Sequence, residues 1–275
     1  MPTSTDRRTV SAMLLIVMLP VAIGIVGAPM RYATPVATAL TVAQLLLIGG
    51  AAYGLAGPAW RSGDENRRRI VVVGMLLILP WALLTLMPGY GPPFAANLAM
   101  NHIRYVILFV SATFMSAAFL MLKDTLADAG ERLLAPLGQA AGLLGTLVQL
   151  VWTAILIGWM ITLAHKPATY LPVYGTLTEN SSDVLLFFAG LLTYVATGCY
   201  ALAFARAGWL GPIKAKLVAV IATIAILGLA ARGLGFPDLG EDWYMVPGDI
   251  VGIPAIPWLM PYLLGVAALF RAARD

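Results

Sequence analysis

The chain has 275 residues, of which 60% are hydrophobic and only 11% are charged, and its mean hydropathy is +0.87. Ordinary soluble domains contain about 25% charged residues, so this composition excludes a soluble globular protein. The formal net charge of +4 resides mainly in the connections between apolar runs, which indicates membrane topology and not nucleic-acid binding.

Eight apolar runs are long enough to cross a membrane, because a transmembrane helix needs about 20 largely apolar residues. The connections between these runs are too short to fold as separate domains. We therefore expect an all-α, polytopic membrane helical bundle of about eight transmembrane helices, forming a single domain over residues 1–275. In chain order, the expected helices cover residues 10–28, 36–57, 70–88, 103–122, 139–163, 184–205, 215–232 and 249–270.

The distribution of Lys and Arg predicts that both termini are cytoplasmic, since basic connections stay on the inner side of the membrane. In this orientation, 13 of the 17 basic residues lie inside, and the formal charges are +6 inside and −2 outside. The basic run Arg67, Arg68 and Arg69 would also meet anionic lipid headgroups. We expect a multi-pass protein of the bacterial cytoplasmic membrane that contacts the lipid bilayer and binds no nucleic acid.

Small residues at a spacing of four predict close helix contacts, because they let helix backbones approach each other in lipid. Gly50 and Gly54 form such a pair in the second expected helix, and Gly138 and Gly142 form another in the fifth. We interpret both pairs mainly as contacts within the bundle. The alternative is that they bind other membrane subunits.

Charged residues are absent from the middle of every expected helix, which disfavours an ion pump or a proton-coupled carrier. Arg104, Arg232 and Asp249 lie close to expected outer ends, and we expect both arginines to pair with carboxylates there. Uncharged polar side chains in the core can bond across helices, for about 0.6 kcal/mol each. The core polar residues are Gln44, Gln149, Ser111, Thr113, Ser116, Thr153, Thr193 and Thr197.

The two histidines are weak candidates for a metal site near the outer surface. His102 directly precedes the fourth expected helix and His165 follows the fifth, so the two could be neighbours. A catalytic zinc site needs about three protein ligands and a water, so carboxylates from Asp183 or Asp249 would have to join them. Two unrelated interfacial histidines are the preferred interpretation, and no metal or other cofactor is assigned.

Prolines interrupt the apolar stretch VPGDIVGIPAIPWLMPYLLG, residues 246–265, in the last expected helix. Pro254, Pro257 and Pro261 follow a spacing of three and then four, which places them on one helix face. Each proline lacks the N–H that would bond the carbonyl four residues earlier. The sequence therefore predicts a helix that is either kinked or broken.

The carbonyls of Ile250, Ile253 and Pro257 lose their usual donors, which is costly in hydrocarbon unless another group satisfies them. In a kinked helix, neighbouring hydroxyls or waters would bond these oxygens. In a broken helix they would line a polar cavity, as unwound helices do in transporters. The candidate ligand-binding residues are Asp249, Ile250, Ile253, Pro257, Trp258, Arg104, Arg232 and Asp183.

Three classes of function remain open from these residues. The favoured class is a non-catalytic membrane protein, namely a sensor, a scaffold or an accessory subunit of a membrane complex. The second is a carrier or channel for a small neutral, lipophilic or cationic solute that uses the proline-interrupted last helix. The third is a lipid-modifying enzyme with an outer-face site, for which no catalytic motif is present.

Overall fold

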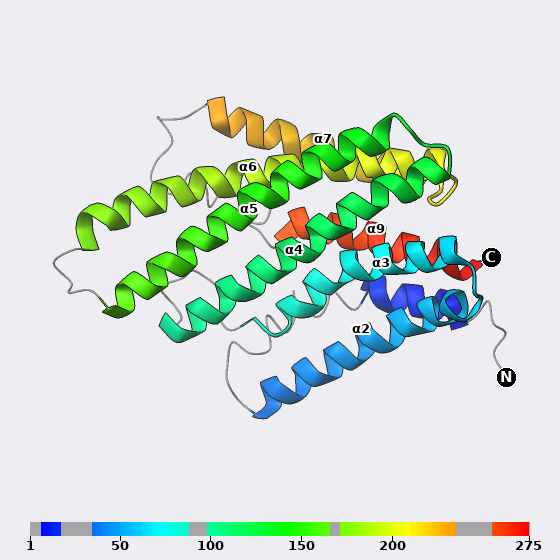
Figure 1. The fold of residues 1–275 in the computed structure, drawn as a ribbon, viewed down its shortest axis with the longest axis horizontal. Coiled ribbons are helices and arrows are strands. Elements are labelled where there is room, and N and C mark those ends of the chain that lie inside the picture. The colour runs from blue at the N-terminus through cyan, green and yellow to red at the C-terminus, as the bar shows by residue number, and fades with distance from the viewer. Residues whose placement is uncertain (1–6, 18–34, 88–97, 166–170, 235–254, 275) are drawn as a thin grey trace.

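A computed structural model describes residues 7–17, 35–87, 98–165, 171–234 and 255–274 of the chain. Every regular element within these ranges is a helix, which confirms the expected all-α class. Short described turns lie at one end of the molecule (Figure 1), which we call the inner end because it carries the basic connections. The helices are residues 7–17, α2 (Pro35–Arg61), α3 (Glu65–Leu84), α4 (Leu98–Asp128), α5 (Leu134–His165), α6 (Leu171–Arg206), α7 (Pro212–Leu234) and α9 (Ala255–Arg274).

Five of the described helices are long and apolar enough to cross a membrane, which supports a multi-pass membrane protein. The expected count of eight crossings is not confirmed. The helices α3 and α9 have only 20 residues each, and each carries arginines toward its inner end. The five candidate spans are Thr38–Arg61, Leu98–Asp128, Leu134–His165, Val184–Arg206 and Pro212–Ala231.

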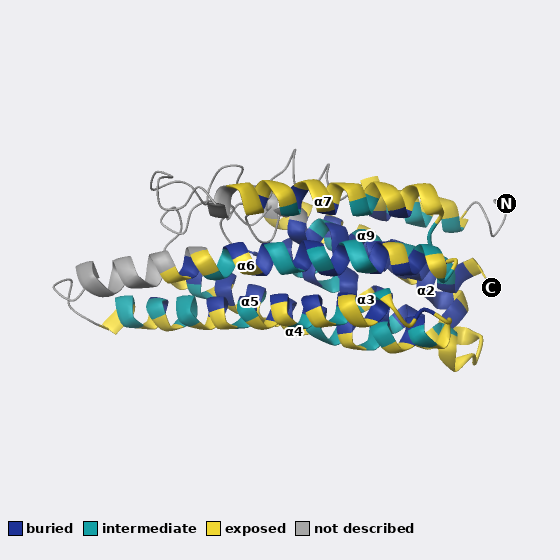
Figure 2. Cartoon of the chain, turned by 90° about the horizontal axis from the view of Figure 1, so that it is seen from above, coloured by how far each residue is buried: buried dark blue, intermediate teal, exposed yellow. Residues whose placement is uncertain are grey.

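The last helix lies inside the bundle, while α7 lies at its edge. The helices α3 to α7 pack side by side in chain order, and α9 packs against α2, α3 and α6. Figure 2 shows α7 as largely exposed. Its outward side chains include Ile213, Ile224 and Leu227, which are 82%, 63% and 63% exposed. Such an apolar face suits lipid acyl chains, which are as apolar as these side chains.

The backbones of α3 and α9 approach each other closely at two facing glycines. A Cβ atom added at Gly74 would lie 3.0 Å from the carbonyl oxygen of Gly265, and one added at Gly265 would lie 2.9 Å from that of Gly74. The antiparallel pairing of the two helices is also seen where Arg67, near the start of α3, bonds the carbonyl of Ala272, near the end of α9. Glycine is needed at both positions because no side chain fits between the backbones.

The predicted pair Gly138 and Gly142 packs within the bundle, as the preferred interpretation requires. A Cβ atom at Gly142 would lie 2.5 Å from the ring of Phe119, and one at Gly138 would lie 3.1 Å from the ring of Tyr200. These two rings stack at 5.6 Å, and the Tyr200 hydroxyl donates a hydrogen bond to the Phe119 carbonyl at 2.8 Å. The glycines of α5 thus make room for an aromatic pair that joins α4 to α6.

In the other predicted pair, Gly54 packs against another described helical segment and Gly50 does not. A Cβ atom at Gly54 would lie 2.7 Å from the hydroxyl oxygen of Ser11, so this glycine contacts the N-terminal helical segment. One added at Gly50 would meet no atom within 4 Å in the described residues. Contact between Gly50 and another subunit therefore stays a prediction.

Two of the inner turns end their helices in the same way, with a glycine in the left-handed conformation. Gly130 follows α4 with φ of 88°, and Gly208 follows α6 with φ of 72°. The N–H of the next residue then bonds a carbonyl of the last helical turn, from Glu131 to Leu126 at 2.9 Å and from Trp209 to Phe204 at 2.8 Å. This is the Schellman arrangement, which satisfies carbonyls at a helix end.

The basic run at the start of α3 joins other helix ends. Arg67 Nη2 donates to the Ala272 carbonyl of α9 at 2.9 Å, and Arg68 Nε donates to the Trp60 carbonyl of α2 at 3.1 Å. Arg69 pairs with Glu65 at 3.1 Å and with Asp128, at the end of α4, at 3.3 Å. Cations at helix C-termini are favourable because free carbonyls concentrate negative charge there. These residues therefore have structural roles besides the topology inferred from the sequence.

Candidate functional site

Three of the eight predicted ligand-binding residues have described side chains, and all three are buried. Pro257 and Trp258 lie in the first turn of α9, and Arg104 lies in α4. Asp183 and Arg232 belong to helices, but their side chains fall outside the described residues. The positions that are wholly outside them are Asp249, Ile250 and Ile253.

The described part of α9 is continuous through two of the three prolines. The described part of the helix starts at Ala255 and includes Pro257. Pro261 lies inside the helix, which continues to Arg274. The described part of α9 is thus helical at both Pro257 and Pro261, whereas Pro254 lies outside the described residues, and a break before Ala255 stays a prediction. The prolines of α9 are buried inside the protein, as is most of this helix.

A hydrogen bond between two fully buried side chains joins the start of α9 to the middle of α5. Trp258 Nε1 donates to Gln149 Oε1 at 3.3 Å, and both residues are 0% exposed. The sequence indicated Gln149 only as one of several core polar groups, because nothing in the pattern links it to the last helix. The structure thus adds a residue to the candidate site that the proline pattern missed.

Three buried polar atoms of neighbouring helices lack partners among the described residues. Gln149 Nε2 of α5, Ser111 Oγ of α4 and Trp81 Nε1 of α3 make no hydrogen bond there. Gln149 and Ser111 are 0% exposed and Trp81 is 5% exposed. Burying an amide or hydroxyl without a partner costs about 1 to 3 kcal/mol in proteins. Most buried polar groups have a partner, so these atoms call for a specific explanation.

These groups lie at one level of the bundle. Their helices have inner termini at Glu65 for α3, Asp128 for α4, Leu134 for α5 and Arg274 for α9, all at the same end of the molecule (Figure 1). Each of the side chains of Trp81, Ser111, Gln149 and Trp258 lies about four to five helical turns from that terminus, at about 5.4 Å per turn. The four side chains are therefore about 22 to 26 Å from the inner end. We call them the central polar cluster.

One member of the cluster, Trp81, contacts an aromatic ring on its inner side. Trp81 makes an edge contact with Tyr262 at a centroid distance of 6.2 Å, and the Tyr262 hydroxyl donates to the Leu15 carbonyl at 2.8 Å. Tyr262 is one turn after Trp258 on α9, and its ring is fully buried. The Tyr262 hydroxyl thus bonds a backbone carbonyl of the helix at residues 7–17. The Trp81 N–H has no partner in the described part of the chain.

Toward the outer end, α4, α5 and α6 extend beyond α3 and α9 (Figure 1). In this outer part Tyr105 makes an edge contact with Trp152 at 6.3 Å. Arg104 lies on the buried face of α4 two turns outward from Ser111, and it is 5% exposed. The pairing of Arg104 with an outer carboxylate stays a prediction.

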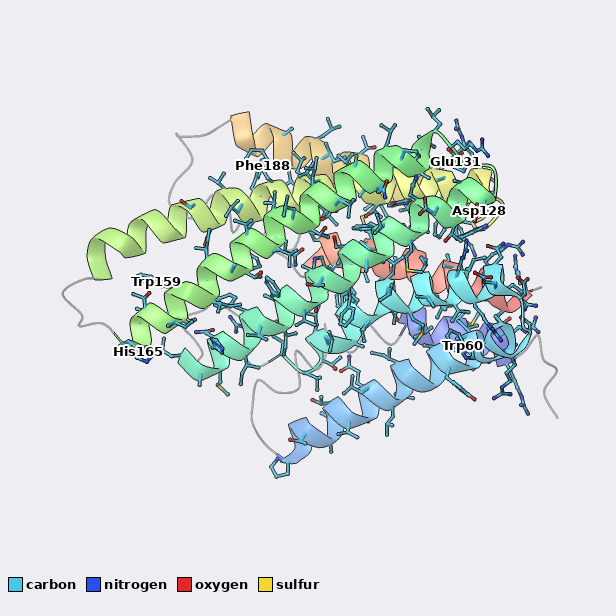
Figure 3. All side chains as sticks on the ribbon, viewed as in Figure 1. Trp60, Asp128, Glu131, Trp159, His165 and Phe188 are labelled. Carbon is cyan, nitrogen blue, oxygen red and sulfur yellow. The ribbon has the colours of Figure 1, made fainter. Side chains whose placement is uncertain are left out.

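The two histidines do not form a metal centre with other described side chains. His165 is the exposed last residue of α5, and its Nδ1 lies 2.9 Å from the Ile161 carbonyl oxygen of its own helix. Figure 3 shows it at the opposite end of the bundle from Asp128 and Glu131. His102 is partly buried in α4. Among the described residues, no group of three or more His, Cys, Asp or Glu side chains could hold a metal ion.

The central polar cluster is uncharged and rich in hydrogen-bond donors. Among the charged side chains that the structure describes, only Arg104 and Glu131 are buried, and both lie away from this level. The cluster therefore offers neutral hydrogen-bond donors, but no titratable pair for acid–base chemistry. No protein-family model, curated protein or solved structure matches the chain.

Proposed function

We propose that this protein is a non-catalytic, multi-pass membrane protein that binds a small lipophilic molecule inside its bundle, at the central polar cluster. The proposal combines the sensor of the favoured class with the carrier of the second class and assigns them a common binding step. The observation that carries it is the amide nitrogen of Gln149, which is fully buried and has no partner among the described residues.

Burying the Gln149 amide nitrogen without a hydrogen-bond partner is energetically costly. Gln149 satisfies the Trp258 N–H through its oxygen, so the same side chain cannot rotate its nitrogen toward that donor without losing the bond. An apolar residue of similar length would avoid the cost of the unpartnered amide. A hydrogen bond from this amide to a polar atom of a bound molecule would remove that cost. The unpartnered amide can therefore serve in binding.

The position of the cluster also supports binding from the membrane. A distance of about 22 to 26 Å from the inner end lies within a bilayer whose hydrocarbon region is about 30 Å thick.

A second candidate is an accessory subunit that binds another membrane protein through α2. The observation that favours it is the exposed pair Gly49 and Gly50, because a Cβ atom at either position would meet nothing within 4 Å in the described residues. A flat surface of this kind suits a second helix. The bacterial cytoplasmic membrane remains the proposed location for either candidate.

The test is recovery of a bound molecule from the full-length protein. The wild type is purified in mild detergent and analysed by native mass spectrometry, followed by extraction and identification of small molecules. We expect a stoichiometric molecule on the wild type and its loss from the Gln149→Met variant, which keeps the length of the side chain and removes the amide.

The matched control is Thr197→Val on α6. Thr197 is also 0% exposed, but its hydroxyl donates to the Thr193 carbonyl of its own helix at 2.7 Å. This variant should retain the molecule. Equal amounts of molecule on the wild type and on Gln149→Met would contradict the proposed site, and a stable partner protein with no bound molecule would favour the second candidate.

A further inference from the structure

The free hydrogen-bonding atoms of the central polar cluster indicate the chemical class of the molecule. We infer that the molecule is a neutral, lipophilic carbonyl compound, whose oxygen accepts hydrogen bonds from Gln149 and its neighbours. The inference rests on the proposed binding function and narrows it from any small lipophilic molecule to one class. It also excludes the cationic solutes that the sequence left open.

The unpartnered atoms of the central polar cluster are mainly hydrogen-bond donors. Trp81 Nε1 and Gln149 Nε2 can only donate, because an indole N–H and an amide NH₂ have no lone pair available for acceptance. The one acceptor of the Gln149 amide already receives the Trp258 N–H. Ser111 can donate or accept, since its hydroxyl rotates. The complementary group must therefore be an acceptor such as a carbonyl oxygen.

Charge also bears on the class of the molecule. The only buried carboxylate among the described side chains is Glu131. It lies just before the inner terminus of α5, about five helical turns or about 27 Å from Gln149. Among the described side chains, no carboxylate lies near the cluster to pair with a cation. An anion would also lack a nearby opposite charge, because the buried Arg104 lies two turns away from Ser111 along α4. Burying an unpaired charge is far more costly than burying a carbonyl.

Aromatic rings bear on the apolar part of the molecule. The rings of Trp81, Trp258 and Tyr262 are all nearly or fully buried around the donors. Such surroundings accept an apolar body and leave only its oxygen to be satisfied. A long-chain ketone has this combination, with one acceptor oxygen and no donor.

The experiment compares three probes of equal chain length on the detergent-purified, full-length protein. They are 2-undecanone, undecane and undecylammonium, which share an apolar chain and differ in the polar group. Binding is measured by the rise of the thermal unfolding midpoint with probe concentration, since a ligand of the folded state stabilises it by mass action. We expect only the ketone to raise the midpoint.

Two variants test which atoms hold the ketone. Gln149→Met and Trp81→Phe should each weaken ketone binding by about fivefold to tenfold, as expected for loss of one hydrogen bond. Trp81→Phe keeps an aromatic ring against Tyr262. This variant therefore provides the test of the site if Gln149→Met does not fold. Thr197→Val should bind the ketone like the wild type.

The possible outcomes separate the two proposals. If undecane stabilises as much as the ketone, or undecylammonium stabilises more, the carbonyl class is wrong while a binding site remains. If no probe shifts the midpoint and no molecule is recovered from the purified protein, the proposed function fails together with this inference. If the ketone binds and both variants bind it equally well, the assignment to the central polar cluster is wrong.

Discussion

The inner end and the middle of the bundle treat buried polar groups in different ways. At the inner end, Glu131 Oε1 accepts hydrogen bonds from the backbone N–H groups of Leu133 and Leu134 at 2.9 and 2.7 Å. Its other oxygen lies 3.5 Å from Arg206 Nη1. In the middle, Gln149 uses its oxygen but leaves its nitrogen without a partner among the described residues. The first arrangement serves stability, whereas the second keeps a capacity to bind.

The lowered pKa of Glu131 indicates that its partners stabilise the charged form of this buried carboxyl. Burial opposes ionisation of this carboxyl, but the hydrogen bonds from Leu134 and Leu133 and the charge of Arg206 outweigh it and hold the pKa below its usual value. The carboxylate therefore caps the start of α5 as a charged group. The central polar cluster contains no such charge, and its neutral donors stay available at every physiological pH.

The largest effect is expected at the contact between the two regions, where α3 crosses α9. In Gly265→Ala the new Cβ would lie 2.8 Å from Leu77 Cβ and 2.9 Å from the Gly74 carbonyl oxygen, so one helix must move. We expect a loss of about 1 to 3 kcal/mol in the free energy of unfolding. Gly228→Ala is the control, because its Cβ would meet nothing within 4 Å in the described residues. Thermal unfolding that ranks the two variants equally would contradict this contact.

A smaller effect is expected from the Glu131 cap at the inner end. Glu131→Ala should cost about 0.5 to 2 kcal/mol, since it leaves the N–H groups of Leu133 and Leu134 without their acceptor. Glu131→Gln keeps an acceptor oxygen and should cost less. The measurement is chemical or thermal unfolding at neutral pH, and an equal loss in both variants would show that the charge alone matters.

The same carboxyl predicts how stability depends on pH. A carboxyl whose pKa is lowered by folding stabilises the folded state fully above its unfolded pKa of about 4.3. This contribution is lost as the pH falls through the folded pKa. The stability difference between wild type and Glu131→Gln should therefore shrink as the pH falls from about 5 to about 3, through the unfolded pKa of glutamate and below it. A constant difference over this range would exclude the cap as its origin.

The smallest effect on stability is expected in the middle. The double variant Gln149→Met with Trp258→Phe removes both partners of the buried hydrogen bond together with the unpartnered amide. Removing both partners can be nearly neutral, so we expect a change of less than about 1 kcal/mol. The single variant Gln149→Met should be less stable than the double, because it leaves the Trp258 N–H without its acceptor. A large loss in the double variant would mean that this region is built for stability like the inner end.

Several features of the fold were predictable from the residues in order. Apolar runs located the helices because hydrocarbon requires long stretches that satisfy their own backbone groups. The fifth expected helix, residues 139–163, lies within α5, Leu134–His165. Gly138 and Gly142 were correctly interpreted as packing positions within the bundle. These properties depend on local composition and spacing, which a linear pattern contains.

The features that the sequence could not resolve depend on what each helix packs against. The proline pattern left open a break at Pro257, whereas the described part of α9 is helical at Pro257 and Pro261 and lies buried inside the bundle. The run of arginines at 67 to 69 indicated topology and headgroup contact, whereas Arg67 and Arg68 bond the final carbonyls of α9 and α2.

The sequence by itself determined that this is an all-helical, multi-pass membrane protein, because composition and run length reflect the solvent in which each segment is stable. Only the tertiary structure decided that α9 lies inside the bundle, that Gly74 meets Gly265, and that Trp258 bonds Gln149. These contacts join helices that are far apart in the chain, and apolar surfaces in lipid carry no signal of their partner. The buried amide of Gln149 acquires its significance from that packing.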